Sequence, residues 1–363
     1  MRHLVRATAY VPSQTHNGTR VAAPDEDLFT LLATALERLD PGTPPSPPPI
    51  SMDLVAALPM EYDPALVAAW GAPVSVVRTE PEPEGLVRAI TSAESGTGGD
   101  LVVAAAEGPG IAPQGPTRDG RDHGSGAVAL RFVEGPGPSL TERLGSLGSP
   151  GSMLDLAFEL RHLVPPDSSG DWTGDWSVDR SSGTPHDTVK AQSYATRSLS
   201  AVSEGAYIPR ARYRESLASR WRFCGERCPR CSSVTFPSRG ACRSCGNRES
   251  LEPIGLPRDD LEVIATTVIG PGGQPTEFDP QVESLGPYEV VIAELTPGAR
   301  VTLQLTDAEP GSVAIGDRID TRLRRLYPME GEWRYGRKAI PRRRDGASSV
   351  FPPIGKTDQP NPG

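Results

Sequence analysis

Four cysteines form two pairs whose spacing suits a metal ion. Cys228 and Cys231 enclose two residues, Cys242 and Cys245 do the same, and residues 232–241 separate the pairs. A Cys-x-x-Cys turn presents two thiolates on one side of a tight knuckle, and two such turns complete the tetrahedral shell that Zn²⁺ prefers. Two disulfides or four unrelated thiols are the simpler alternatives, but paired spacing is more specific than a cysteine count. We expect a structural zinc with no open coordination position.

The positions of the cysteines and the lengths of the apolar runs indicate the cellular compartment. All five cysteines lie between 224 and 245, so the sequence offers no disulfide framework, which is typical of a reducing compartment. Cys224 is the spare one, and we interpret it as a structural or auxiliary thiol beside the knuckle. No long apolar run follows the first six residues, and the longest apolar patch, 101–106, is far too short to cross a bilayer. We therefore expect a soluble, cytoplasmic protein with no membrane partner.

A basic segment surrounds the cysteines. Residues 205–250 hold ten arginines and three glutamates, a charge of +7, whereas the whole chain carries −9, which leaves −16 for the remainder. Such a local field favours an anionic ligand or an acidic partner surface, although a solvated basic face is an equal alternative. The arginines that we single out as candidate ligand or partner contacts are Arg210, Arg212, Arg214, Arg220, Arg222 and Arg239.

Around this segment, the length and composition predict several domains. A chain of 363 residues suggests two or three domains, and a hydrophobic fraction of 37% with 38 Gly and 39 Pro predicts long loops beside modest cores. Acidic residues at 25–27 are expected in the first turn of a helix, where the helix dipole favours them. Hydrophobic periodicity predicts strands at 3–11, 51–57, 73–78, 100–106 and 127–133, and helices at 63–70 and 85–94. It also predicts a first helix that opens at 24–27, carries apolar residues at helical spacing from 28 to 39 and is stopped by the Pro-Gly at 41–42. This alternation indicates a layered α/β domain over residues 1–164.

The rest of the chain divides by composition. Residues 165–204 are rich in Pro, Ser and Gly and are predicted to be a linker, with Trp172 and Trp176 either anchoring it to a neighbouring surface or packing on their own domain. Residues 205–255 form a basic arm with interleaved aromatics and then the ribbon, and residues 346–363 are expected to be a disordered tail. Strands are predicted at 261–269, 288–295, 300–305, 318–326 and 333–340, with a long loop at 270–287. Five short strands over residues 256–345 suit a small closed OB-fold barrel.

Four stretches of the first half resemble the thiolase fold, specifically the hydroxymethylglutaryl-CoA synthase branch. They are Ala-Tyr-Val-Pro at 9–12, Ala-Pro-Asp-Glu-Asp at 23–27, the strand at 100–107 and the glycine turn at 124–127, and the resemblance spans about residues 1–180. That family's nucleophile is a cysteine at the start of the helix that we place near 85, but no cysteine precedes 224 here. A threonine without a base does not replace a thiolate. We interpret this half as a degenerate, non-catalytic half-thiolase, kept for packing or for a dimer-like contact with an intact relative.

The second half resembles the acyl-CoA-associated family called domain of unknown function thirty-five, over residues 207–340. The matching stretches are Tyr213, Leu217 and Trp221 of the arm, both cysteine pairs, and residues 236–239, 288–295 and 315–319. The resemblance implies a rubredoxin-like zinc ribbon with an OB-fold barrel. It also implies an accessory subunit that bridges thiolase and hydroxymethylglutaryl-CoA synthase and helps to hold a CoA-linked substrate. The arginine-rich arm fits that implication, because guanidinium groups pair with phosphates and stack on adenine.

Three functions are compatible with these features. The first is a non-catalytic accessory or scaffold subunit of a thiolase-fold acyl-CoA condensing or thiolytic complex, with structural zinc and possibly CoA or acyl-CoA as ligand. The alternative is a single-stranded nucleic-acid binder, since ribbons and OB barrels both do that work, although the acidic chain argues against nucleic acid. The third is a free-standing acyltransferase that uses Cys224.

Overall fold

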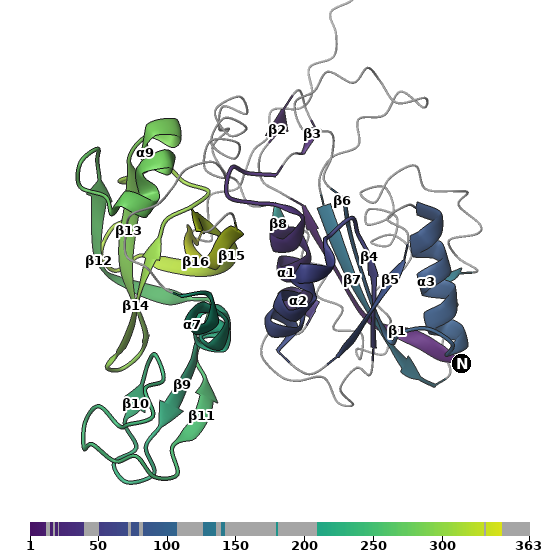
Figure 1. The fold of residues 1–363 in the computed structure, drawn as a ribbon, viewed down its shortest axis with the longest axis horizontal. Helices are drawn as coiled ribbons and strands as arrows, with labels where there is room; N and C mark the ends of the chain where they lie inside the picture. Colours follow the sequence, from purple (N-terminus) through teal and green to yellow (C-terminus); the bar gives the residue numbers. More distant parts are fainter. Residues whose placement is uncertain are drawn as a thin grey trace, which may run out of the picture.

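The computed structural model describes two bodies that lie side by side (Figure 1). The described residues are 1–11, 15–16, 19–20, 22–39, 51–71, 74–79, 83–106, 126–135, 139–141, 179–180, 209–329 and 332–342. The predicted linker, apart from residues 179–180, and the predicted tail lie outside these residues. So do Trp172, Trp176 and residues 80–82, just before the helix predicted near 85.

The amino-terminal body is built on a six-stranded sheet with the order β5-β4-β6-β7-β1-β8. Three parallel strands, β5 (Ser75–Thr79), β4 (Ser51–Val55) and β6 (Leu101–Ala106), form one side. The strand β7 (Gly126–Glu134) is antiparallel to both β6 and β1 (Arg2–Val11), and β8 (Asp179–Arg180) pairs parallel with β1. β2 (Thr15–His16) and β3 (Thr19–Arg20) form a separate pair. The predicted strands are therefore confirmed.

Helices cover both faces of this sheet, as the layered α/β prediction requires. α1 (Leu28–Leu39) and α2 (Asp63–Trp70), which follows the short η1 (Met60–Tyr62), lie on the face toward the second body, and α3 (Pro83–Ser95) lies on the opposite face (Figure 1). Two apolar cores result, one under each helical layer. Central strands that are buried on both faces explain the nearly continuous apolar run of β6.

The expected place of the acidic residues at 25–27 is wrong. The first turn of α1 contains no acidic residue, because the helix begins at Leu28. Asp27 caps the helix: its Oδ1 accepts from the Thr30 amide at 2.9 Å, and the Asp27 amide donates to Thr30 Oγ1 at 2.8 Å. Asp25 and Glu26 are buried and point into the contact with the second body.

The second body consists of the arm, the ribbon and a five-stranded sheet. The arm is two short helices, α7 (Arg210–Glu215) and α8 (Leu217–Arg222), that meet at Ser216. The ribbon contains β9 (Cys224–Arg227), β10 (Val234–Thr235) and β11 (Glu252–Gly255), and it extends away from both sheets (Figure 1). The predicted basic arm thus leads directly into the ribbon.

All five predicted strands of the second sheet are present. Their order is β14 (Ala299–Gln304), β13 (Tyr288–Thr296), β12 (Leu261–Ile269), β15 (Arg318–Met329) and β16 (Glu332–Pro341). The two edges of the sheet meet in one parallel bridge, Leu305 to Ala339, so the strand pairing among the described residues does not amount to a closed barrel. The predicted loop at 270–287 is wrong in part, because it contains η2 (Thr276–Phe278) and α9 (Asp279–Leu285).

The two bodies share one apolar core. Phe29 of α1 packs at 4.7 Å between ring centres on Tyr335 of β16 and at 5.6 Å on Trp221 of the arm. All three side chains are less than 5% exposed. The arm therefore fills the seam between the bodies. In the part of the chain that the structure describes, no helix has the length and apolarity needed to span a membrane.

Candidate functional site

The four paired cysteines converge as the sequence predicted. Their sulfur atoms all lie within 4.8 Å of one another, with 3.7 Å between Cys228 and Cys245 and 3.5 Å between Cys231 and Cys242. A tetrahedral ion with Zn–S bonds of about 2.3 Å requires sulfur–sulfur distances of roughly 3.8 Å. The arrangement therefore fits a four-sulfur zinc site.

Each cysteine pair is shaped by a backbone turn. The Ser232 amide donates to the Cys228 carbonyl at 2.8 Å, and the Gly246 amide donates to the Cys242 carbonyl at 2.9 Å. Ser232 and Gly246 both have positive φ, 59° and 73°, which turns the chain sharply after the second cysteine of each pair. This local geometry explains why two residues within a pair suffice to place both sulfurs on one side.

A polar neighbour favours the thiolate form of one of the four sulfurs. The Ser233 hydroxyl lies 3.1 Å from both the Cys231 and the Cys242 sulfur, and this hydrogen bond is the largest cause that lowers the pKa of the Cys242 thiol to about 6. A thiolate is the form that binds metal. Cys224 lies in β9, half-buried and outside the four-sulfur group, which agrees with its interpretation as a spare thiol.

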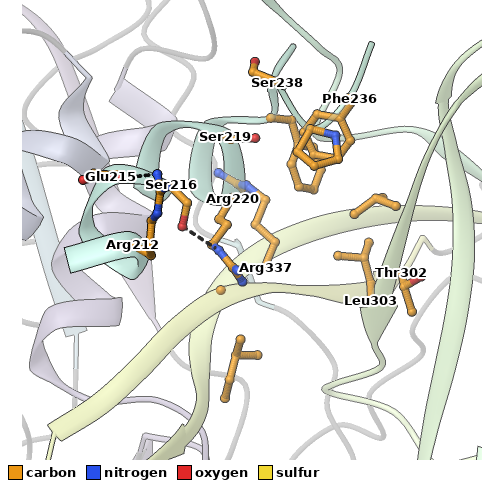
Figure 2. A pocket seen from close by; sticks show the side chains of 15 residues that line it. Arg212, Glu215, Ser216, Ser219, Arg220, Phe236, Ser238, Thr302, Leu303 and Arg337 are labelled. Carbon is orange, nitrogen blue, oxygen red and sulfur yellow. Dashed lines mark hydrogen bonds and ion pairs between the residues drawn. The ribbon is translucent and has the colours of Figure 1, made fainter. Parts of the chain in front are cut away.

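A cavity of about 620 Å³ lies between the arm, the ribbon and the second sheet, and we call it the arm pocket (Figure 2). Its apolar wall includes Phe223, Phe236, Leu303 and Leu326, and its polar wall consists of arginines, hydroxyl groups and the Glu215 carboxylate. Ser219 contributes a buried hydroxyl oxygen that has no hydrogen-bond partner among the described residues. An apolar cavity with a few polar groups is the usual form of a small-molecule site.

Two of the six candidate arginines reach this pocket. Arg220 lines it and donates from Nε to Ser216 Oγ at 2.8 Å, and Arg212 lines it while paired with Glu215 at 2.9 Å (Figure 2). Arg337 lines it as well, but its guanidinium pairs with Glu37. Sequence reasoning missed Arg337, because it follows the arm by more than one hundred residues in the sequence and reaches the pocket only through the fold of β16.

The other four candidates lie elsewhere. Arg210 pairs with Glu332 on the surface, and Arg214 is exposed and does not line the arm pocket. Arg239 is exposed on the ribbon, where its amide donates to Glu226. Arg222 donates to the Trp70 carbonyl at 2.5 Å, at the end of α2. The six arginines therefore do not form one ligand site.

The Arg222 contact depends on a glycine. Gly71 ends α2 in the left-handed region with φ 88°, and a Cβ there would lie 0.8 Å from Arg222 Nη1. The guanidinium thus occupies the space that a side chain would fill. Its charge faces the negative end of the α2 dipole, which makes Arg222 a clamp between the bodies.

A buried ion-pair network, which sequence reasoning missed, joins the two bodies. Arg324 of β15 is fully buried and contacts Glu26 at 2.9 Å and Asp307 at 3.2 Å, and it donates to the Tyr10 hydroxyl at 3.0 Å. Lys338 of β16 pairs with Asp25 at 2.9 Å. The only sequence signal was complementary charge, an acidic run at 25–27 and basic pairs at 324–325 and 337–338.

Burial and pairing compete within this network. Burial opposes ionisation of Asp25, but Lys338 and Arg324 outweigh it and lower the pKa of Asp25 to about 2. Burial lowers the pKa of Lys338, against the attraction of Asp25. Buried ionised groups of this kind are tolerated only where partners surround them.

Comparisons with known proteins agree with the predicted resemblance to the domain of unknown function thirty-five (DUF35) family. A DUF35 domain-containing scaffold protein of Methanothermobacter thermautotrophicus is 34% identical over 116 residues, which are 32% of this chain and 81% of the relative. The protein of the same description from Methanocaldococcus jannaschii is 35% identical over 124 residues, 33% of this chain and 83% of the relative. No family model matches the chain.

Solved structures were matched at low similarity. The Ltp2-ChsH2(DUF35) aldolase has 22% identity and a TM-score of 0.28, with 38% of this chain and 98% of that chain covered. The 3-oxoacyl-(acyl carrier protein) synthase III of Pseudomonas aeruginosa has 16% identity and a TM-score of 0.30, with 37% of this chain and 52% of that chain covered. Because two relatives are 34% and 35% identical over 81% and 83% of their own length, the chain belongs to the DUF35 domain-containing family.

Proposed function

We propose that this chain is a non-catalytic accessory and scaffold subunit of a thiolase-fold acyl-CoA condensing or thiolytic complex. In this proposal the four cysteines hold a structural zinc, and the arm pocket holds part of CoA or of an acyl-CoA. The amino-terminal body is the degenerate half-thiolase that the sequence resembles. We also propose that the second sheet, with the bridge between its edges, is an OB-type barrel. The domain limits and the cytoplasmic location remain predictions.

The arm pocket is the observation that carries the proposal. Its apolar wall suits an acyl or pantetheine chain, and the Arg212 and Arg220 guanidiniums at its other wall suit a phosphate. Arg220 has no acidic partner among the described residues, so its charge is available to a ligand. In this proposal the chain uses such a pocket to present a substrate to its enzyme partner.

A CoA titration by calorimetry tests the ligand. Arg220→Ala should weaken CoA binding roughly tenfold, because one charge-assisted contact is worth about 1.4 kcal/mol or more. Arg248→Ala, an exposed ribbon arginine outside the pocket, is the matched control and should bind as the unmodified chain does. No saturable CoA binding, or equal effects of both variants, would refute the pocket assignment.

A pull-down of the tagged protein from its native extract, followed by mass spectrometry, tests the partner. A thiolase-fold enzyme in stoichiometric amount is the expected result. Salt-sensitive retention of single-stranded nucleic acid would instead favour the alternative function. Turnover of acetoacetyl-CoA by the isolated chain, lost in Cys224→Ala, would establish the acyltransferase hypothesis and contradict ours.

A further inference from the structure

A small cavity of about 150 Å³ lies between the two bodies, beside α9, and we call it the carboxylate pocket. Residues 23–25 line it from the first body, and α9, the start of β13 and residues 305–310 line it from the second. Lys338 of β16 also lines it. The space is large enough for several water molecules or for one small ligand.

The carboxylate pocket carries more negative than positive charge. Four carboxylates and one ammonium group line it, those of Asp25, Glu289, Asp307, Glu309 and Lys338. Lys338 pairs with Asp25 at 2.9 Å, and Asp307 pairs with the buried Arg324 at 3.2 Å. Glu289 and Glu309 have no basic partner among the residues that the structure describes. Two negative charges of the lining are therefore not neutralised by any described side chain.

Glu289 is the buried one of these two residues. It is 1% exposed, and its carboxylate accepts hydrogen bonds from the Thr266 hydroxyl and, at 2.8 Å, from the Gly311 amide. Both donors are neutral, and a carboxylate can accept about four hydrogen bonds, so Glu289 has capacity for a further donor. Buried charges in proteins are normally paired with an opposite charge. A cationic ligand in the carboxylate pocket would supply the partner that the described side chains do not.

A buried amide oxygen independently points to a donor in the carboxylate pocket. Gln281 of α9 lines the cavity and is 7% exposed, yet its Oε1 has no hydrogen-bond partner among the described residues. A buried acceptor that is left without a donor is destabilising. An ammonium group carries three N–H donors, so one such group can serve both Gln281 and Glu289.

Glu309 places the second of these charges at the surface. It is exposed, and the Ser312 amide donates to its carbonyl at 3.1 Å. Gly311, whose amide binds Glu289, lies in the same turn. The turn therefore brings one buried and one exposed carboxylate to the same cavity.

The spacing of these groups suits an organic cation better than a divalent metal. Among the described residues, only the four cysteines of the ribbon bring three or more Cys, His, Asp or Glu ligand atoms within 4.8 Å of one another. Mg²⁺ and Ca²⁺ need oxygen ligands gathered at about 2.0–2.6 Å, whereas ammonium groups on a flexible chain reach acceptors that lie farther apart. We propose that the carboxylate pocket binds a short alkyl diammonium ion, with one nitrogen between Glu289 and Gln281 and the other at Glu309. This site is separate from the arm pocket and does not depend on the ligand proposed there.

Three probes with the same four-carbon body test the proposal on the full chain by calorimetry: 1,4-diaminobutane, butylamine and butan-1-ol, which carry two, one and no positive charges at neutral pH. The diamine should bind saturably at one site, and each charge should contribute roughly tenfold in affinity. Glu309→Gln should reduce the affinity of the diamine to that of butylamine and leave butylamine binding unchanged. Glu249→Gln removes an exposed carboxylate of the ribbon, changes the net charge equally and should have no effect.

The buried end of the carboxylate pocket gives an independent test. Glu289→Gln should weaken binding of both amines roughly tenfold, and Glu309→Gln decides the question even if that variant does not fold. Equal binding of the three probes, no saturation, or equal effects of Glu309→Gln and Glu249→Gln would overturn the proposal. Diamine binding that is lost in potassium chloride but retained in tetramethylammonium chloride would assign the charge to an inorganic ion and overturn it as well.

Discussion

The four-cysteine site and the contact between the two bodies both gather charged groups, but from very different distances along the chain. The four sulfurs come from residues 228–245, and backbone turns within each pair set their positions. In the contact between the bodies, Arg337 meets Glu37 across 300 residues and Arg324 meets Tyr10 across 314. The spacing of residues along the sequence therefore determines the four-cysteine site, whereas the contact between the bodies forms only after both sheets have folded and docked.

The difference also concerns what replaces water around the charge. In the ribbon, a metal ion would neutralise thiolates that lie partly at the surface, since Cys231 and Cys245 are exposed. In the contact between the bodies, side chains neutralise one another, and Arg324 and Glu26 are almost completely buried. Removal of one partner should thus affect the two regions in different ways.

The largest effect is expected from a cysteine of the ribbon. Cys231→Ser removes one of four ligands, and structural zinc supplies roughly 10–16 kcal/mol of apparent binding energy in small zinc modules. The variant should lose its bound zinc and most of the order of the ribbon. Zinc content by atomic emission and amide hydrogen exchange of residues 224–255 measure both.

Cys224→Ser is the matched control for this prediction, because Cys224 lies outside the four-sulfur group. It should retain one zinc per chain. A Cys231→Ser protein that also retains one zinc per chain would contradict the ligand assignment.

A smaller but still large loss is expected in the contact between the bodies. Arg324→Met leaves Glu26 and Asp307 buried without their shared cation, and breaking a buried pair in this way costs about 3–5 kcal/mol. Urea unfolding should show this decrease in the free energy of unfolding. Hydrogen exchange should rise on both sides of the contact and remain unchanged in the ribbon.

An exposed ion pair provides the control. Arg318 pairs with Asp260 at 3.0 Å, but both side chains are about half exposed, so Arg318→Met should cost less than about 1 kcal/mol. Equal losses in the two variants would mean that burial does not set the strength of the network around Arg324.

The same contrast explains how much the sequence could predict. Strand and helix positions followed from periodicity, and the four-cysteine cluster followed from pair spacing, because both depend on neighbours along the chain. The roles of Asp25 and Arg222 could not be predicted, since an acidic run before a helix and an arginine in a basic arm each suit a solvated surface equally well. Only the docked structure shows that Arg222 donates a hydrogen bond to the Trp70 carbonyl and that Asp25 forms an ion pair with Lys338. The short helix at 279–285 was missed because its seven residues carry too little periodic signal.

The smallest expected effect is the pH dependence of the contact between the bodies. The folded-state pKa of Asp25 is about 2, below its value near 3.9 in an unfolded chain, so its ionised form stabilises the fold above pH 4. This contribution, about 2 kcal/mol, should be lost as the pH falls from about 4 to 2. The pKa of Glu26 is raised, mainly by burial, and its titration acts in the opposite direction, so the unmodified chain shows only the net of the two.

Comparison with Asp25→Asn isolates the contribution of Asp25. Urea unfolding of both proteins between pH 6 and pH 2.5 should show a difference that is largest at the upper end and that shrinks by about 2 kcal/mol as the pH approaches 2.5. A difference that stays constant over this range would mean that Asp25 is not held ionised by Lys338 and Arg324. The contact would then depend on the shared apolar core around Phe29 rather than on its ion pairs. In that case Arg324→Met should also lower the free energy of unfolding by much less than predicted. The two measurements therefore test the same ion-pair network, one by removing a cation and the other by removing an anion.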